Sequence, residues 1–203
     1  METFEAIRSR RSVKRFDPEH RLTDGEIEQL VGAAVLSPTS FNIQNWRFVV
    51  VTDPELKRRI REVGYDQPQF SDASAVIFLC GDLQAHARDP ERYWRNVPEE
   101  QRRAIVGMIR AAYDGRPERQ HDEALRSCGM AAQTLMLAAR AMGYDTCPMV
   151  GFDFAAVAEL IRLPADHEIV MAVAVGKRLA DPHPRPGPLP LAEVMFRDRF
   201  PER

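Results

Sequence analysis

The chain lacks long apolar runs, a marked excess of either charge, and paired cysteines, and each absence excludes a class of protein. No apolar stretch reaches the roughly 18 residues that span a bilayer, and the N-terminus has no apolar signal core. The 28 basic and 30 acidic residues nearly cancel, so we expect neither a nucleic acid nor a membrane as partner. The three cysteines, without CxxC spacing, favour a reducing compartment, and we expect a cytoplasmic protein.

The usual catalytic signatures are also missing. None of the 11 glycines forms GxGxxG or GxxxxGK[ST], which argues against a Rossmann domain or a P-loop. There is no GxSxG or HExxH, and the five histidines are isolated from one another. We therefore expect no metal site, no hydrolase triad and no acid–base pair supplied by the protein alone.

The apolar pattern that is present predicts a single α+β domain over residues 1–203. Thr23 and Glu26 have capping-box spacing, and they precede a helix that ends at Ser37-Pro38. Helical periodicity and buried-strand runs predict the remaining elements, which are helices over 3–9 and 121–142 and strands over 47–51, 75–80 and 168–175.

Two segments depart from this core pattern. Residues 86–126 are strongly charged and predict a helical excursion whose scattered apolar positions suit surface helices: Trp94, Ile105, Val106, Ile109 and Tyr113. The last segment, about 181–203, is rich in proline, which predicts an extended arm without a regular helix.

Three polar segments are candidates for ligand binding. Arg10, Arg11, Ser12 and Lys14 lie within five residues and can grip a phosphate or an electron-rich ring edge, although a solvated helix end has the same composition. The loop 37–46 is dense in hydroxyl and amide side chains, and in the turn 147–153 a glycine could let backbone amides approach a flat ligand. Ordinary turn chemistry explains either of these two segments equally well.

Taken in order, the motifs resemble the FMN-dependent nitroreductase family. The motifs are RRSVKRF at 10–16, SPTSFNIQNWRFVVV at 37–51, PMVGFD at 148–153 and a strand ending in Gly-Lys-Arg at 176–178. DEALRSC and GYDTCPMVGFD look most like the small bacterial NAD(P)H nitroreductase branch. The resemblance spans nearly the whole chain and implies a mainly antiparallel sheet flanked by helices, in an interlocked homodimer with FMN at the interface.

The resemblance also implies which residues bind FMN. One chain would supply the phosphate, ribityl and ring contacts from Arg10, Arg11, Ser12, Lys14, Gln67, Gln69, Pro148, Met149, Val150 and Gly151. Lys14 would give electrostatic support at the pyrimidine end, where positive charge stabilises anionic reduced flavin. The partner chain would contribute Ser37, Pro38, Thr39, Ser40 and Asn42.

The chain departs from the family pattern at two points. Val150 stands where many relatives have a glutamate, which leaves the choice between NADH and NADPH open. Pro186 and Pro188 stand where relatives carry basic residues. We expect Arg185 to replace those residues, with Lys177 and Arg178 as further phosphate candidates.

The implied activity is NAD(P)H-dependent reduction of a nitroaromatic, quinone or related electrophile by ping-pong hydride transfer, with the flavin carrying the redox chemistry. Three alternatives remain at this point. A flavin-cleaving, dehalogenating or enone-reducing enzyme would use the same scaffold, and a flavin-binding redox sensor would lack turnover. A helical regulator that binds nucleic acid through residues 8–15 is disfavoured by the near-neutral charge.

Overall fold

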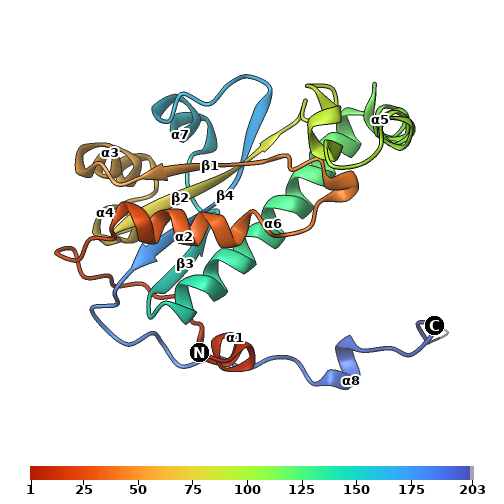
Figure 1. Ribbon diagram of the computed structural model, residues 1–203. Helices are drawn as coiled ribbons and strands as arrows, with labels where there is room; N and C mark the ends of the chain where they lie inside the picture. The colour runs from red at the N-terminus through yellow and green to blue at the C-terminus, as the bar shows by residue number, and fades with distance from the viewer. Residues whose placement is uncertain (202–203) are drawn as a thin grey trace.

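The computed structural model describes residues 1–201, and its centre is a four-stranded sheet with the order β1-β2-β4-β3 (Figure 1). The strands are β1 (Trp46–Val51), β2 (Ala75–Asp82), β3 (Asp145–Met149) and β4 (His167–Gly176). Every neighbouring pair is antiparallel, with a single irregularity between Leu79 and Cys80 where β2 faces β4. The predicted α+β class and the antiparallel sheet are confirmed.

Helices cover both faces of this sheet. Along β2, Val76 and Phe78 belong to one apolar cluster and Ile77 and Leu79 to another, as the alternation of side chains in a strand requires. The first cluster packs under α3 (Pro54–Val63), α4 (Gln69–Asp72) and α7 (Phe154–Leu160). The second packs under α2 (Asp24–Ala34) and α6 (Pro117–Ala141), as Figure 1 shows.

Local signals in the sequence set most helix ends. Thr23 and Glu26 form the predicted capping box at the start of α2, and the Asp53 side chain accepts a hydrogen bond from the Leu56 N–H of α3. Gly143 follows α6 with a φ of 81°, the left-handed conformation that favours glycine. The first helix, α1 (Thr3–Ser9), has the predicted bounds.

Other boundaries differ from the prediction. The long helix α6 begins at Pro117 rather than at residue 121, because proline at the first helical position costs no hydrogen bond. Strand β3 includes Pro148 and was not predicted as a strand, and its edge position explains why a proline is tolerated there.

The expectation that the apolar residues of the excursion lie on surface helices is wrong for most of them. The excursion contains η2 (Pro90–Trp94) and α5 (Glu99–Tyr113), and four positions that the sequence suggested were on surface helices are buried: Ile105, Val106, Ile109 and Tyr113. Ile105, Ile109 and Tyr113 pack with Ile43 in a small apolar cluster, beside the short turn η1 (Ser40–Asn42). These scattered apolar residues form a small local core, because the 37–46 loop packs against them.

The C-terminal arm leaves the sheet after β4 and extends along the bottom of the molecule (Figure 1). It is not wholly free of helix, because one turn, α8 (Leu191–Val194), forms where the run of prolines ends at Pro190. Residues 202–203 of the predicted arm lie outside the described residues. Among residues 1–201, no helix is both long and apolar enough to cross a membrane.

Candidate functional site

The N-terminal basic string lies along the outer edge of β3. Ser12 forms a parallel bridge with Thr146, and the Val13 N–H donates to the Thr146 carbonyl at 3.0 Å. This pairing buries Val13 in the core and leaves its neighbours Ser12 and Lys14 on the opposite side, at a cavity. The extended conformation of the string therefore presents polar side chains together while a single apolar residue anchors it.

The cavity has a volume of about 300 Å³, and the C-terminal arm forms one of its walls. The Arg185 guanidinium donates to the Arg10 carbonyl at 2.8 Å, and Arg11 donates to the His183 carbonyl. The structure thereby brings four predicted residues together with Arg185. The lining residues are Arg10, Arg11, Ser12, Lys14, His183, Pro184, Arg185 and Pro186.

The electrostatics of this cavity favour an anion. None of its lining residues is acidic, and among residues 1–201 its three arginines and Lys14 form no ion pair with a carboxylate. Arg10 Nη1 is buried without a hydrogen-bond partner in the described chain. Burial, followed by the charges of Arg185 and Arg11, holds the pKa of Arg10 below its usual value. A phosphate would supply both the missing acceptor and the missing charge.

The turn that follows β3 lies next to this cavity. Lys14 Nζ lies 3.6 Å from the Cys147 sulfur, and the Gln67 side chain donates to the Gly151 carbonyl at 2.5 Å. A methyl group at Gly151 would meet its nearest atom at 3.6 Å, an ordinary contact, so packing within the chain does not explain the glycine. Val150 is exposed, whereas Gln69 is buried. The exposed turn can therefore receive a planar ligand.

The polar loop 37–46 is anchored elsewhere, on α6. The Ser37 hydroxyl donates to Thr134 Oγ1 at 2.8 Å, and the Ser40 N–H donates to the buried Glu123 carboxylate at 3.1 Å. Phe41 and Asn42 both have positive φ values, 51° and 54°, which are uncommon for residues other than glycine. The contacts to α6 hold this backbone in its strained conformation.

One chain does not bring the loop and the basic cavity together. Glu123 holds the loop near the start of α6, whereas Arg140, near its end, donates to Ser9 Oγ beside the basic string. At about 1.5 Å per residue, roughly 25 Å of helix separates the Ser40 anchor from Arg140, whereas the Ser37 anchor at Thr134 lies roughly 9 Å from it. The far end of the loop and the basic string therefore lie toward opposite ends of α6 (Figure 1).

The two further phosphate candidates have other partners. The Lys177 ammonium donates to the Gly143 carbonyl at 2.8 Å and lies 4.4 Å from the centre of the Tyr144 ring. Arg178 lies 4.0 Å from a carboxylate oxygen of Asp145 and 3.4 Å from one of Asp181. Neither residue lines the basic cavity.

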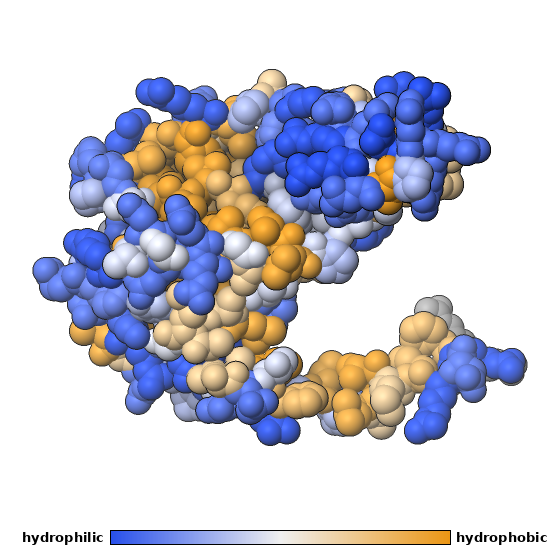
Figure 2. All heavy atoms as spheres, viewed as in Figure 1, coloured by the Kyte–Doolittle hydropathy of each residue, from blue (hydrophilic) through white to orange (hydrophobic). Residues whose placement is uncertain are grey.

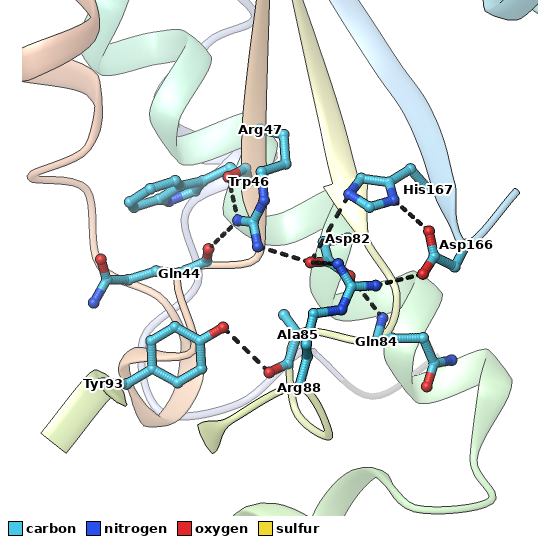
Figure 3. A network of polar contacts seen from close by, with 10 residues as sticks. All are labelled: Gln44, Trp46, Arg47, Asp82, Gln84, Ala85, Arg88, Tyr93, Asp166 and His167. Carbon is cyan, nitrogen blue, oxygen red and sulfur yellow. Dashed lines mark hydrogen bonds and ion pairs between the residues drawn. The ribbon is translucent and has the colours of Figure 1, made fainter. Parts of the chain in front are cut away.

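A network of charged side chains that the sequence did not suggest lies at the other end of the sheet (Figure 3). The fully buried Asp82 carboxylate accepts hydrogen bonds from Arg47 at 2.7 Å and from Arg88 at 3.4 Å. Asp166 pairs with Arg88 and with His167, so β1, β2, the excursion and the start of β4 are linked. Asp82, Asp166 and His167 could together face a metal ion, but the two guanidinium groups already neutralise the carboxylates.

A second, larger cavity of about 810 Å³ adjoins this network. We call it the arginine cavity, because four of its thirteen lining residues are arginines and none is acidic. The lining residues are Val31, Asn42, Gln44, Trp46, Arg47, Phe48, Arg88, Arg92, Tyr93, Trp94, Arg95, Asn96 and Val97. The only sequence signal for it is the density of arginine and aromatic residues over 88–97, which composition alone does not separate from a solvated surface.

Comparison with known proteins agrees with this fold. Protein DrgA of Synechocystis sp. is 54% identical over 200 residues, covering 96% of this chain and 95% of DrgA. An oxygen-insensitive NADPH nitroreductase of Helicobacter pylori is 29% identical over 182 residues, covering 86% of this chain and 87% of the relative. A structure from Exiguobacterium sibiricum, solved in complex with FMN, matches with a TM-score of 0.90 at 29% identity and covers 97% of both chains.

The family model described as the nitroreductase family matches residues 7–177. This range contains the basic string, the polar loop, the turn after β3 and all four strands of the sheet. The chain belongs to the nitroreductase family.

Proposed function

We propose that the protein is an FMN-dependent NAD(P)H oxidoreductase whose basic cavity holds the FMN phosphate. The observation that carries the proposal is the cluster of Arg10, Arg11 and Arg185, which has no carboxylate partner among residues 1–201 and includes the buried, unpartnered Arg10 Nη1. The FMN complex of the Exiguobacterium relative and the NADPH nitroreductase of Helicobacter support this choice of cofactor and donor.

The remaining candidates follow the edge of β3 away from the phosphate site. Ser12, which lines the cavity, would bind the ribityl chain, and Lys14 would supply positive charge at the pyrimidine end of the ring. Gln67 and Gln69, together with Pro148, Met149, Val150 and Gly151, border the ring face in this proposal. When bound, FMN supplies the redox chemistry, taking a hydride from NAD(P)H and delivering electrons to an acceptor.

We further propose an interlocked homodimer in which the polar loop reaches the flavin of the partner. Within one chain the Ser40 end of the loop is anchored roughly 25 Å along α6 from the anchor of the basic string, which favours contact with the partner's flavin. The arm supports the same arrangement, because six of its large apolar residues are exposed in the single chain: Leu189, Leu191, Val194, Met195, Phe196 and Phe200. Figure 2 shows this apolar surface along the arm, well away from the rest of the chain.

The donor and the acceptor would use one open pocket in turn, which gives a ping-pong cycle. In the dimer, Ser37, Pro38, Thr39, Ser40 and Asn42 would line this pocket from the partner side. The excursion would form its roof, since the Trp94 indole donates to the Phe41 carbonyl at 2.9 Å and Asn42 donates to the Tyr93 carbonyl at 2.9 Å. A nitroaromatic, a quinone or an enone would be the acceptor.

Purified protein tests the proposal directly. We expect a yellow protein with one FMN per chain, and turnover of NADH or NADPH with menadione or a nitroaromatic. Parallel lines in double-reciprocal plots would support the ping-pong cycle. Protein that stays colourless after incubation with FMN would contradict the cofactor, and yellow protein without repeated turnover would indicate a redox sensor.

A further inference from the structure

Glu123 differs from the other buried acidic residues of the described chain. Asp82 and Asp145 are also buried, and each accepts a hydrogen bond from an arginine, at 2.7 Å and 3.1 Å. Glu123 is 7% exposed, and within residues 1–201 its one ion pair joins Oε2 to the exposed Arg126 at 3.7 Å, beyond hydrogen-bond distance. Acidic residues are rarely buried without a paired charge, so the position of Glu123 requires another explanation.

The close partners of Glu123 are neutral donors. Its Oε1 atom accepts the Ser40 N–H and the Ser127 hydroxyl, both at 3.1 Å. Ser127 lies one turn further along α6, whereas Ser40 begins the turn η1 of the polar loop. The carboxylate therefore ties α6 to the backbone of the loop. Such a bond is strong, because its acceptor is charged.

The loop that Glu123 holds has an uncommon backbone. Phe41, Asn42 and Gln44 have φ values of 51°, 54° and 43°. Residues in this conformation persist only where surrounding contacts fix them, and they are often found at functional sites. On its other side, the loop accepts the bond from the Trp94 indole to the Phe41 carbonyl at 2.9 Å. The loop is thus held between the start of α6 and the excursion (Figure 1).

We propose that Glu123 is a positioning residue, which presents the polar loop to the flavin and electron acceptor of the partner chain without touching either. This inference rests on the proposed function, in which Ser40 and Asn42 line the pocket from the partner side. Without the carboxylate, the Ser40 N–H loses its acceptor, and the backbone at Phe41 and Asn42 relaxes toward ordinary φ values. The pocket then loses its contacts with the loop, although none of its own residues has changed.

Fluorescence titration of flavin-free protein with FMN, together with steady-state kinetics, tests this role. In Glu123→Ala we expect the Kd for FMN and the KM for menadione each to rise about tenfold or more, with a smaller change in kcat. In Glu123→Gln both constants should stay within about threefold of wild type, because the amide oxygen can still accept the Ser40 N–H.

Glu26→Ala is the matched control. Glu26 also accepts hydrogen bonds from two residues, Tyr144 and Thr23, but it lies at the end of α2 that is remote from the loop. The control should lose stability while it keeps the wild-type Kd for FMN and KM for menadione. Glu123→Leu is a second variant, which fills the space of the side chain if the cavity in Glu123→Ala prevents folding.

Three outcomes would overturn the inference. In the first, FMN affinity and the KM for menadione are unchanged when Glu123 is replaced by alanine or leucine. In the second, Glu26→Ala shows an equal loss, which would indicate general destabilisation. In the third, Glu123→Gln shows an equal loss, which would assign the effect to the charge rather than to the hydrogen bond. Wild-type protein that does not bind FMN would instead contradict the proposed function, and the inference with it, so the two failures are distinguishable.

Discussion

Arg185 is the residue through which the arm completes the basic cavity. Its guanidinium donates to the backbone carbonyl of Arg10, which fixes its charge beside Arg10 and Arg11 without any carboxylate to neutralise it. Burial, followed by the like charges of Arg185 and Arg11, lowers the pKa of Arg10. A bound phosphate would reduce the repulsion between these charges.

We therefore expect Arg185→Ala to weaken FMN binding by about tenfold or more, because one charge-assisted contact to phosphate is lost. Quenching of flavin fluorescence during titration of flavin-free protein measures the dissociation constant. Arg197→Ala is the control, since Arg197 lies on the same arm outside the cavity. Equal dissociation constants for the two variants would argue against a phosphate contact from Arg185.

Glu26 and Tyr144 form a second interaction with a measurable consequence. The Tyr144 hydroxyl donates to the Glu26 carboxylate, which also accepts the Thr23 N–H at 2.8 Å. The bond from Tyr144, followed by those from Thr23, lowers the pKa of Glu26 from 4.5 to about 2. The same bond raises the pKa of Tyr144 to about 12.

A carboxyl pKa that is lowered on folding stabilises the protein above pH 4.5, and this stabilisation is lost as pH falls toward 2. Tyr144→Phe should therefore lower the free energy of unfolding at neutral pH, and its difference from wild type should shrink as the solution is acidified. Urea unfolding at a series of pH values measures this difference. Tyr65→Phe, at an exposed tyrosine, should show no such trend, and a pH-independent difference for Tyr144→Phe would contradict the assignment.

At the scale of elements, the excursion is held by its own small core. Ile105, Ile109 and Tyr113 are spaced at helical intervals on the buried side of α5 and pack against Ile43. The cluster joins the excursion to the polar loop, and the bond from Trp94 to the Phe41 carbonyl reinforces it. The loop conformation thus depends on a helix distant in sequence.

Ile109→Ala should lower the free energy of unfolding by about 2–4 kcal/mol, because it leaves a cavity at a fully buried position. Met108→Ala, on the neighbouring position with 52% exposure, should cost less than about 1 kcal/mol. Denaturant unfolding of both variants makes the comparison. Similar losses for the two would mean that α5 does not pack as described.

At the scale of the whole molecule, the exposed apolar arm and the divided site are the observations that support the proposed homodimer. A single chain leaves Leu191, Val194 and Phe196 in solvent, and an interface would bury them. The same interface would unite the basic cavity of one chain with the polar loop of the other.

Deleting residues 189–203 should therefore convert a dimer into a monomer at micromolar concentration while leaving Arg185 in place. Light scattering measures the mass, and the FMN dissociation constant should rise in parallel because the partner loop is lost. The control is L191A alone, which should retain the dimer. A truncated protein that remains dimeric with unchanged FMN affinity would contradict the role of the arm.

The sequence by itself determined the class of the sheet, the helix caps and the order of the family motifs. Capping at Thr23 and Asp53 and the left-handed turn at Gly143 act over a few residues, so their patterns are readable along the chain. The basic string was recognisable as a ligand candidate for the same reason. To distinguish this string from a solvated helix end required its neighbours in the fold, such as Arg185, which sequence periodicity does not identify.

Only the tertiary structure decided which charges remain unbalanced. It placed Arg185 at the basic cavity, gave Lys177 and Arg178 other partners, and neutralised Arg47 and Arg88 with Asp82 and Asp166. It also placed the Ser40 end of the polar loop roughly 25 Å along α6 from the anchor of the basic string. Ion pairing and separation depend on distances between residues far apart in sequence, and the folded chain alone sets those distances.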